Sequence, residues 1–203
     1  MGLISNGTTI FDAGAMQAGG GSMVFIKKIT ASSSSTISFV DGASSVVLDS
    51  TYKEYLFTFN NLHPQTDTIQ LHINYSIDGG SNYNAEKTST FFLSRHAEDN
   101  SSQELSYKTG QDLENSASNQ QLTVDMDNDN DSGMSGFLRL YDPSNTTFIK
   151  HWTSRIQGCQ TNAHSMEHYT AGYVNTTSAV DAVQFTASSG NLDSGDICLY
   201  GIN

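Results

Sequence analysis

Apolar and polar side chains alternate along much of this chain with a period of two residues. Between residues 69 and 77 an apolar side chain stands at every odd position and a polar one at every even position. Successive side chains of a β-strand point to opposite faces, so this pattern predicts a strand with one buried face and one face in water. Tyr55, Phe57 and Phe59 repeat the apolar positions of this pattern, and the full alternation returns at 122–126.

Other segments with strand character bring the predicted total to about eleven. They lie at 24–29, 36–41, 88–94, 136–141, 147–156, 168–174, 180–187 and 196–202. Turn-forming residues separate them, at Asp41-Gly42, Asp78-Gly79-Gly80, Ser189-Gly190-Asn191 and Ser194-Gly195-Asp196. Asp142 to Asn145 predicts a type I turn within a hairpin. Many short antiparallel strands with one apolar face form two packed sheets or a closed barrel. We predict an all-β fold, an antiparallel β-sandwich of jelly-roll type.

Residues 1–22 follow neither the strand period nor the helix period and end in a glycine-rich joint at 19–21. We interpret them as an extended N-terminal arm, followed by one sandwich domain at 23–203. The arm carries the apolar residues Leu3, Ile4, Ile10, Phe11 and Met16. These are too many for a solvated tail, so we predict that the arm docks on another protein.

Residues 95–120 carry little apolar pattern. We predict a long loop there, with a short helical turn at 111–117. Long loops on a sandwich are frequent sites of partner contact, and a solvated loop without a partner is the alternative.

Composition and charge exclude two classes of partner. Ser, Thr and Asn supply 28, 20 and 16 residues, whereas only 15% of the chain is charged, so short neutral side chains supply most of the polarity. The formal net charge is -12, so nucleic acid and anionic membranes would be repelled. We find no signal peptide and predict synthesis in a reducing cytoplasm, with Cys159 and Cys198 as separate thiols.

Two motifs suggest metal chemistry. His164-Ser165-Met166-Glu167-His168 matches the H-x-x-E-H pattern of zinc peptidases, which requires a helix, but the flanking residues predict a turn and a strand. Asp125, Asp127, Asp129 and Asp131 alternate as the ligands of a calcium loop do. Ser132 and Leu138 depart from the EF-hand pattern, so a solvated acidic turn is the alternative to a calcium site.

No other pattern specifies an active site. The chain lacks G-x-S-x-G, a phosphate-binding loop and a dinucleotide fingerprint. No pair among its 21 acidic residues can be selected as glycosidase carboxylates. Trp152 could be a surface anchor or a core residue. We therefore predict a protein that is not an enzyme, with no catalytic residues and no cofactor other than the calcium considered above.

Three segments resemble a family of small virion proteins of marine tailed bacteriophages, including cyanophages. They are the opening MGLISNGTTIFDAGAM, the segment 145–151, and the tail AGYVNTTSAVDAVQFTASSGNLDSGDICLYGIN with its ending of the L-Y-G-I type at 199–202. The resemblance covers both ends of the chain around a divergent middle. It implies a structural component of the particle and carries no catalytic residue.

From this resemblance and the arm we predict a non-enzymatic structural protein on the virion surface, made in the host cytoplasm. A capsid decoration or cement protein is the first hypothesis, and a tail-fibre or tail-tip adhesin for a host glycan or protein is the alternative. The predicted partners are further copies of the chain, as a homotrimer, and the major capsid protein or tail proteins of the same virion. An arm that one domain cannot bury is often buried on a neighbouring copy.

Overall fold

The computed structural model describes the backbone of residues 3–5, 8–12, 15–16 and 22–203, and side chains from residue 22 onward. Within the N-terminal segment, β1 (Leu3–Ser5), β2 (Thr8–Asp12) and β3 (Ala15–Met16) pair with one another as a separate sheet. The predicted docking side chains therefore lie outside the described side chains. The arm is not uniformly extended, because its backbone doubles back into these three short antiparallel strands.

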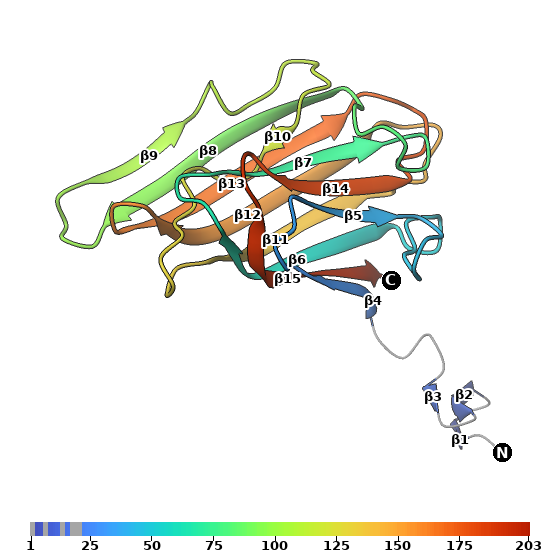
Figure 1. The fold of residues 1–203 in the computed structure, drawn as a ribbon. Coiled ribbons are helices and arrows are strands. Elements are labelled where there is room, and N and C mark those ends of the chain that lie inside the picture. The colour runs from blue at the N-terminus through green and yellow to red at the C-terminus, as the bar shows by residue number, and fades with distance from the viewer. Residues whose placement is uncertain (1–2, 6–7, 13–14, 17–21) are drawn as a thin grey trace.

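Twelve further strands form two antiparallel sheets, and the described residues include no helix. The strands are β4 (Met23–Thr30), β5 (Thr36–Val40), β6 (Glu54–Pro64), β7 (Leu71–Ser76), β8 (Lys87–Ala97), β9 (Gln103–Tyr107), β10 (Gln120–Gln121), β11 (Met134–Tyr141), β12 (Lys150–Gln160), β13 (His164–Val174), β14 (Ala182–Ala187) and β15 (Leu192–Ile202). The large sheet has the order β4-β15-β6-β11-β12-β13-β8-β9, and the small sheet has the order β10-β7-β14-β5. The all-β prediction is confirmed (Figure 1).

The pairing of these strands is nested. β4 pairs with β15, β5 with β14, β6 with β11, and β7 with β10, so early strands join late ones from the outside inward. The hairpins β8–β9 and β12–β13 interrupt this series and widen the large sheet beyond β11. Figure 1 shows β8 and β9 at the far side of the large sheet, with β9 as its edge strand. None of the residues of β9 is buried.

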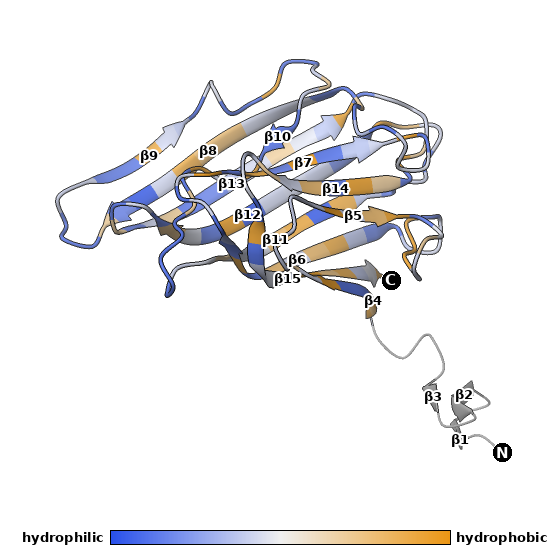
Figure 2. Ribbon diagram, viewed as in Figure 1, coloured by the Kyte–Doolittle hydropathy of each residue, from blue (hydrophilic) through white to orange (hydrophobic). Residues whose placement is uncertain are grey.

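The core lies between the two sheets and is built from aromatic rings. Phe39 of β5, Phe57 of β6 and Phe185 of β14 meet edge to face, with ring centroids 5.3 to 6.4 Å apart. Trp152 of β12 is 1% exposed and packs near Tyr75 of β7, which confirms its assignment to the core. Figure 2 shows apolar bands along β5 and β14, the strands that cover this part of the large sheet.

Two fully buried lysines enter the same interior without a carboxylate partner. The ammonium of Lys87 donates hydrogen bonds to Asn74 Oδ1 at 2.8 Å and to the carbonyl of Ala85 at 3.0 Å. Burial lowers the pKa of Lys87 to about 8. Lys150 donates to two backbone carbonyls in the same way. These lysines hold polar backbone and side-chain groups together inside the sandwich, a role that the sequence pattern did not reveal.

Three local predictions were wrong. Residues 122–126 form no strand, because Asp125 takes a left-handed backbone conformation with φ of 44°. Residues 95–120 are not one loop, since β8 runs to Ala97 and pairs with β9. No helical turn forms at 111–117, where Asn115 also has a left-handed φ of 44°. Only a two-residue strand, β10, follows before the acidic turn.

Candidate functional site

The H-x-x-E-H motif lies on strand β13 rather than on a helix. His164 and His168 are four residues apart on the strand, which separates them by about 13 Å and prevents them from sharing a metal ion. His168 is buried, donates from Nδ1 to the carbonyl of Ile156 at 3.1 Å, and accepts from the Val124 amide at Nε2. Burial lowers its pKa to about 4. His168 is therefore a neutral histidine that joins β12, β13 and the segment before the acidic turn.

The four aspartates of the acidic turn do not share one site, because Asp127, Asp129 and Asp131 line one cavity with Asp67 and Glu98, and Asp125 lines another. Asp125 accepts a hydrogen bond from Gln160 Nε2 at 2.6 Å and faces a different cavity from the other three. Asp127 accepts from Ser132 Oγ at 2.8 Å. Among the residues that the structure describes, no group of three or more His, Cys, Asp or Glu side chains is placed to hold a metal ion. Calcium binding at this turn stays a prediction.

A histidine and carboxylate pair lies beside this turn, in a polar cavity of about 700 Å³. His63 Nδ1 lies 2.8 Å from Asp193 Oδ1, and its Nε2 lies 3.1 Å from the carbonyl of Asp129. Burial opposes protonation of His63, but these hydrogen bonds outweigh it and raise its pKa. Because both ring nitrogens are engaged, neither is left to activate a serine. The His63–Asp193 pair therefore holds the acidic turn against β6 and β15.

The outer face of the large sheet, turned away from the small sheet, presents a row of side chains across five strands. The strand register places one residue of each strand directly opposite the next. In order they are Tyr107 of β9, Phe92 of β8, Tyr169 of β13, Arg155 of β12 and Phe137 of β11. Alternation dictates which residues face outward, since Phe91 is fully buried and its neighbour Phe92 is 39% exposed. The sheet thereby carries aromatic rings on its solvent face.

Contacts within this row hold its rings in place. The rings of Phe92 and Tyr169 stack with centroids 4.7 Å apart and planes 6° apart. Arg155 covers the Tyr169 ring, with Cζ 5.5 Å from the centroid, and also pairs with Glu167. The Tyr169 hydroxyl donates to the same carboxylate at 2.8 Å. The hydrogen bond from Arg155 lowers the pKa of Glu167, so the carboxylate stays ionised and the pair is internally neutral.

A depression of about 350 Å³ adjoins this row, and we call it the outer-face groove. It is lined by residues 88–90 of β8, 151–153 of β12 and 171–173 of β13, and its accessible lining is mostly apolar. His151 and Tyr173 meet edge to face at 6.3 Å at one side. Thr90, Ala171 and Thr153 stand opposite one another in the next outward row.

The short side chain of Ala171 leaves this hollow. Its neighbour Gly172 faces the core, where a Cβ would lie 2.5 Å from the carbonyl oxygen of Thr88 and 2.9 Å from the Trp152 ring. Ala171 is short, whereas Tyr173 and Tyr169 on either side of it are long. Sequence reasoning missed the groove because cross-strand register is invisible in a linear pattern. Adjacent Phe91 and Phe92 were the available signal, since one of two neighbours in a strand must face outward.

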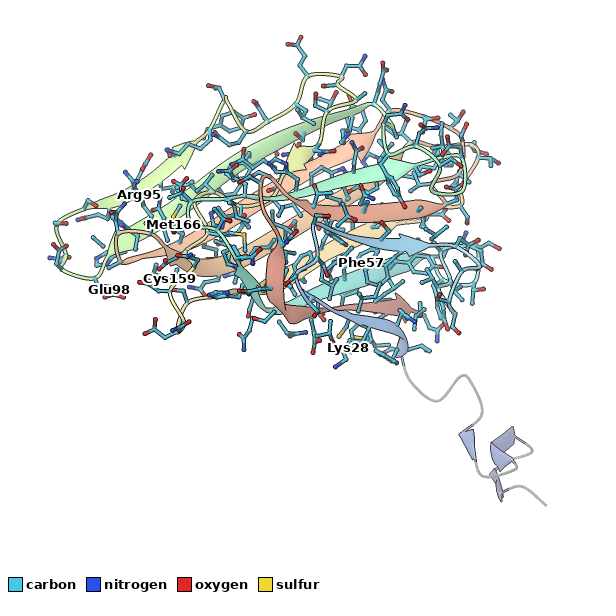
Figure 3. The ribbon with its side chains drawn as sticks, viewed as in Figure 1. Lys28, Phe57, Arg95, Glu98, Cys159 and Met166 are labelled. Carbon is cyan, nitrogen blue, oxygen red and sulfur yellow. The ribbon has the colours of Figure 1, made fainter. Side chains whose placement is uncertain are left out.

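The far end of the large sheet differs in character from the groove. Figure 3 shows Arg95, Met166, Glu98 and Cys159 at the end where β8, β12 and β13 reach their turns, with Lys28 on the opposite edge strand. Cys159 is half-buried and Cys198 is buried, and both are free thiols, as predicted. Arg95 and Lys108 both pair with the single carboxylate of Glu104, so these three side chains together carry one net positive charge.

Comparisons with protein-family models, with curated proteins and with solved structures found no match to this chain. In the described part of the chain no helix is long and apolar enough to cross a membrane.

Proposed function

We propose that this chain is a non-enzymatic structural protein of the virion exterior, acting as a capsid decoration or cement protein. The observation that carries the proposal is the nested pairing of β4 with β15, β5 with β14, β6 with β11, and β7 with β10. A long hairpin rolled up in this way is a jelly roll, to which we assign the domain, with β8–β9 and β12–β13 as additions. Viral capsid proteins and lectins use this architecture.

The pairing of the N-terminal strands is consistent with a docking arm. β1, β2 and β3 pair among themselves and add no strand to the large sheet or to the small sheet. The arm can therefore bind a capsid subunit, or a neighbouring copy in a homotrimer, without unpairing the sandwich. The resemblance to phage virion proteins at both ends of the chain supports the same role, and synthesis in the host cytoplasm with assembly onto the particle follows from it.

Deletion of residues 1–18 should abolish incorporation into particles while leaving the thermal transition of the domain nearly unchanged. Several apolar side chains, at about 1.5–3 kcal/mol each, would contribute to docking, less the cost of ordering the segment. Incorporation is measured by mass spectrometry of purified particles, and folding by calorimetry of the purified variant. A truncated protein that no longer folds would show that the arm belongs to the sandwich. Normal incorporation of the truncated protein would show that the loops, and not the arm, bind the particle.

A tail-fibre or tail-tip adhesin is the second candidate function. The exposed aromatic row and the outer-face groove favour it, because a decoration protein held only through its arm needs no such face. Copy number separates the candidates: decoration requires many copies distributed over the shell, whereas an adhesin requires few copies at the tail.

A further inference from the structure

We propose that the outer-face groove binds a neutral carbohydrate, a short chain of pyranose units that runs along β8 and β13 from the groove to the stacked rings of Phe92 and Tyr169. The inference goes beyond the proposed structural role and does not depend on where the protein sits in a particle. It follows from the lining of the groove, from the stacked rings beside it and from the absence of uncompensated charge.

The lining combines apolar surface with hydroxyl groups. The C–H faces of a pyranose ring pack against apolar and aromatic surface, while its hydroxyls need hydrogen-bond partners at the rim. Tyr173 and His151 provide the rings, and Thr90 and Thr153 provide hydroxyls on either side of Ala171. Small-ligand sites have this composition, mostly apolar with a few polar groups that fix orientation, and start at about 300 Å³.

The stacked rings of Phe92 and Tyr169 extend this surface by their edges, because Phe92 and Arg155 cover the two faces of the Tyr169 ring. Phe92 and Tyr169 lie two residues along β8 and β13 from Thr90 and Ala171, which is about 7 Å along each strand. Two linked pyranose units span that distance. The contacts with Arg155 and Glu167 hold Tyr169 in place before any ligand arrives, so little conformational entropy is lost on binding. The groove and the ring stack thus form adjacent contacts for one oligosaccharide.

Charge selects a neutral ligand. The residues that line the groove include no Asp, Glu, Lys or Arg. The charged side chains beside the groove on the outer face are paired, Arg155 with Glu167 and Arg139 with Glu54, whereas Lys87 and Lys150 are buried on the inner side of the sheet. An anionic polysaccharide would meet no free cation there and would be repelled by the net charge of -12. A stable interface with a second copy of this chain buries about 800 Å² per partner and would have to cover the sheet face well beyond the groove.

Isothermal titration of the purified full-length protein with cellotetraose, chitotetraose and maltotetraose tests the proposal, with an alginate tetrasaccharide as the anionic comparison. We expect at least one of these neutral tetrasaccharides to bind. Tyr173→Ala should weaken that binding by about tenfold or more, since it removes a ring from the groove. Ala171→Leu is an independent variant that fills the groove and keeps its rings, and it should weaken binding similarly. Calorimetry establishes that each variant folds.

Phe25→Ala is the matched control, because Phe25 is 58% exposed on β4, at the opposite edge of the sheet. It should bind the tetrasaccharide as the unaltered protein does. Three results would overturn the proposal: no binding of any neutral tetrasaccharide, binding of the alginate tetrasaccharide only, or binding by both groove variants that is as tight as binding by the unaltered protein. Self-association in sedimentation that Tyr173→Ala abolishes would assign the groove to a second copy instead. None of these results bears on incorporation into particles, so the structural role stands or falls separately.

Discussion

Replacing Gly136 with alanine should destabilise the protein by about 3 kcal/mol or more, enough to threaten folding. Gly136 lies within β11, which is paired on both sides, by β6 and by β12. A Cβ there would overlap the carbonyl oxygen of Arg155 and lie 2.7 Å from Cα of Ile156. Both obstacles are backbone, so no side-chain rotation relieves them. Denaturant unfolding followed by fluorescence of the core Trp152 measures the loss.

Gly133→Ala provides the matched control, just before the same strand. The nearest atom to a Cβ at that position is Cα of Asn61, at an ordinary contact distance of 3.6 Å. Replacing Gly133 with alanine should therefore change the free energy of unfolding by less than about 1 kcal/mol. Equal stability of the two variants would contradict the close approach of β11 and β12 at Gly136.

Lowering the pH from 6.5 to 4 should reduce the free energy of unfolding by about 3 kcal/mol through His168 alone. Burial holds the pKa of His168 at about 4 in the folded protein, against 6.5 for an exposed histidine. Between these values the unfolded chain binds a proton that the folded protein does not, so acid favours unfolding. His168→Gln cannot be protonated and should lose this part of the pH dependence. Urea unfolding at a series of pH values measures this pH dependence.

His63 provides a comparison of opposite sign. Its pKa is raised in the folded protein by Asp193 and the Asp129 carbonyl, so its contribution is present below pH 6.5 and is lost as the pH rises through the folded pKa. His63→Gln should therefore cost more stability at pH 5 than at pH 8. For the first of these predictions, full acid sensitivity in His168→Gln would contradict the assignment of His168 as a buried, neutral histidine.

Periodicity predicted most of the fold because a two-residue repeat directly reports which side chains are buried. The strand containing 71–76 and the hairpin turn at 142–145 are examples, the latter with a hydrogen bond from the Asn145 amide to the Asp142 carbonyl. The pattern failed at 122–126, where Leu122 and Met126 are buried but a left-handed residue bends the chain between them. It also failed at β9, an edge strand without a buried residue.

The groove and the buried lysines could not be predicted for a different reason. Tyr169 lies opposite Phe92 only because β13 pairs with β8 in one particular register, and their sequence separation gives no hint of it. The charge of Lys87 predicts a position at the surface, and only its hydrogen bonds to Asn74 and Ala85 explain its burial. Motif spacing was equally uninformative for His168, since the same four-residue spacing has different geometry on a helix and on a strand.

Mass spectrometry of purified particles, separated into heads and tails, decides whether this chain is an exterior structural protein. The proposal predicts many copies in the head fraction, accessible to protease or antibody on intact particles. Recovery in the tail fraction alone would replace decoration by the adhesin. Particles that do not contain the chain at all would contradict the structural role.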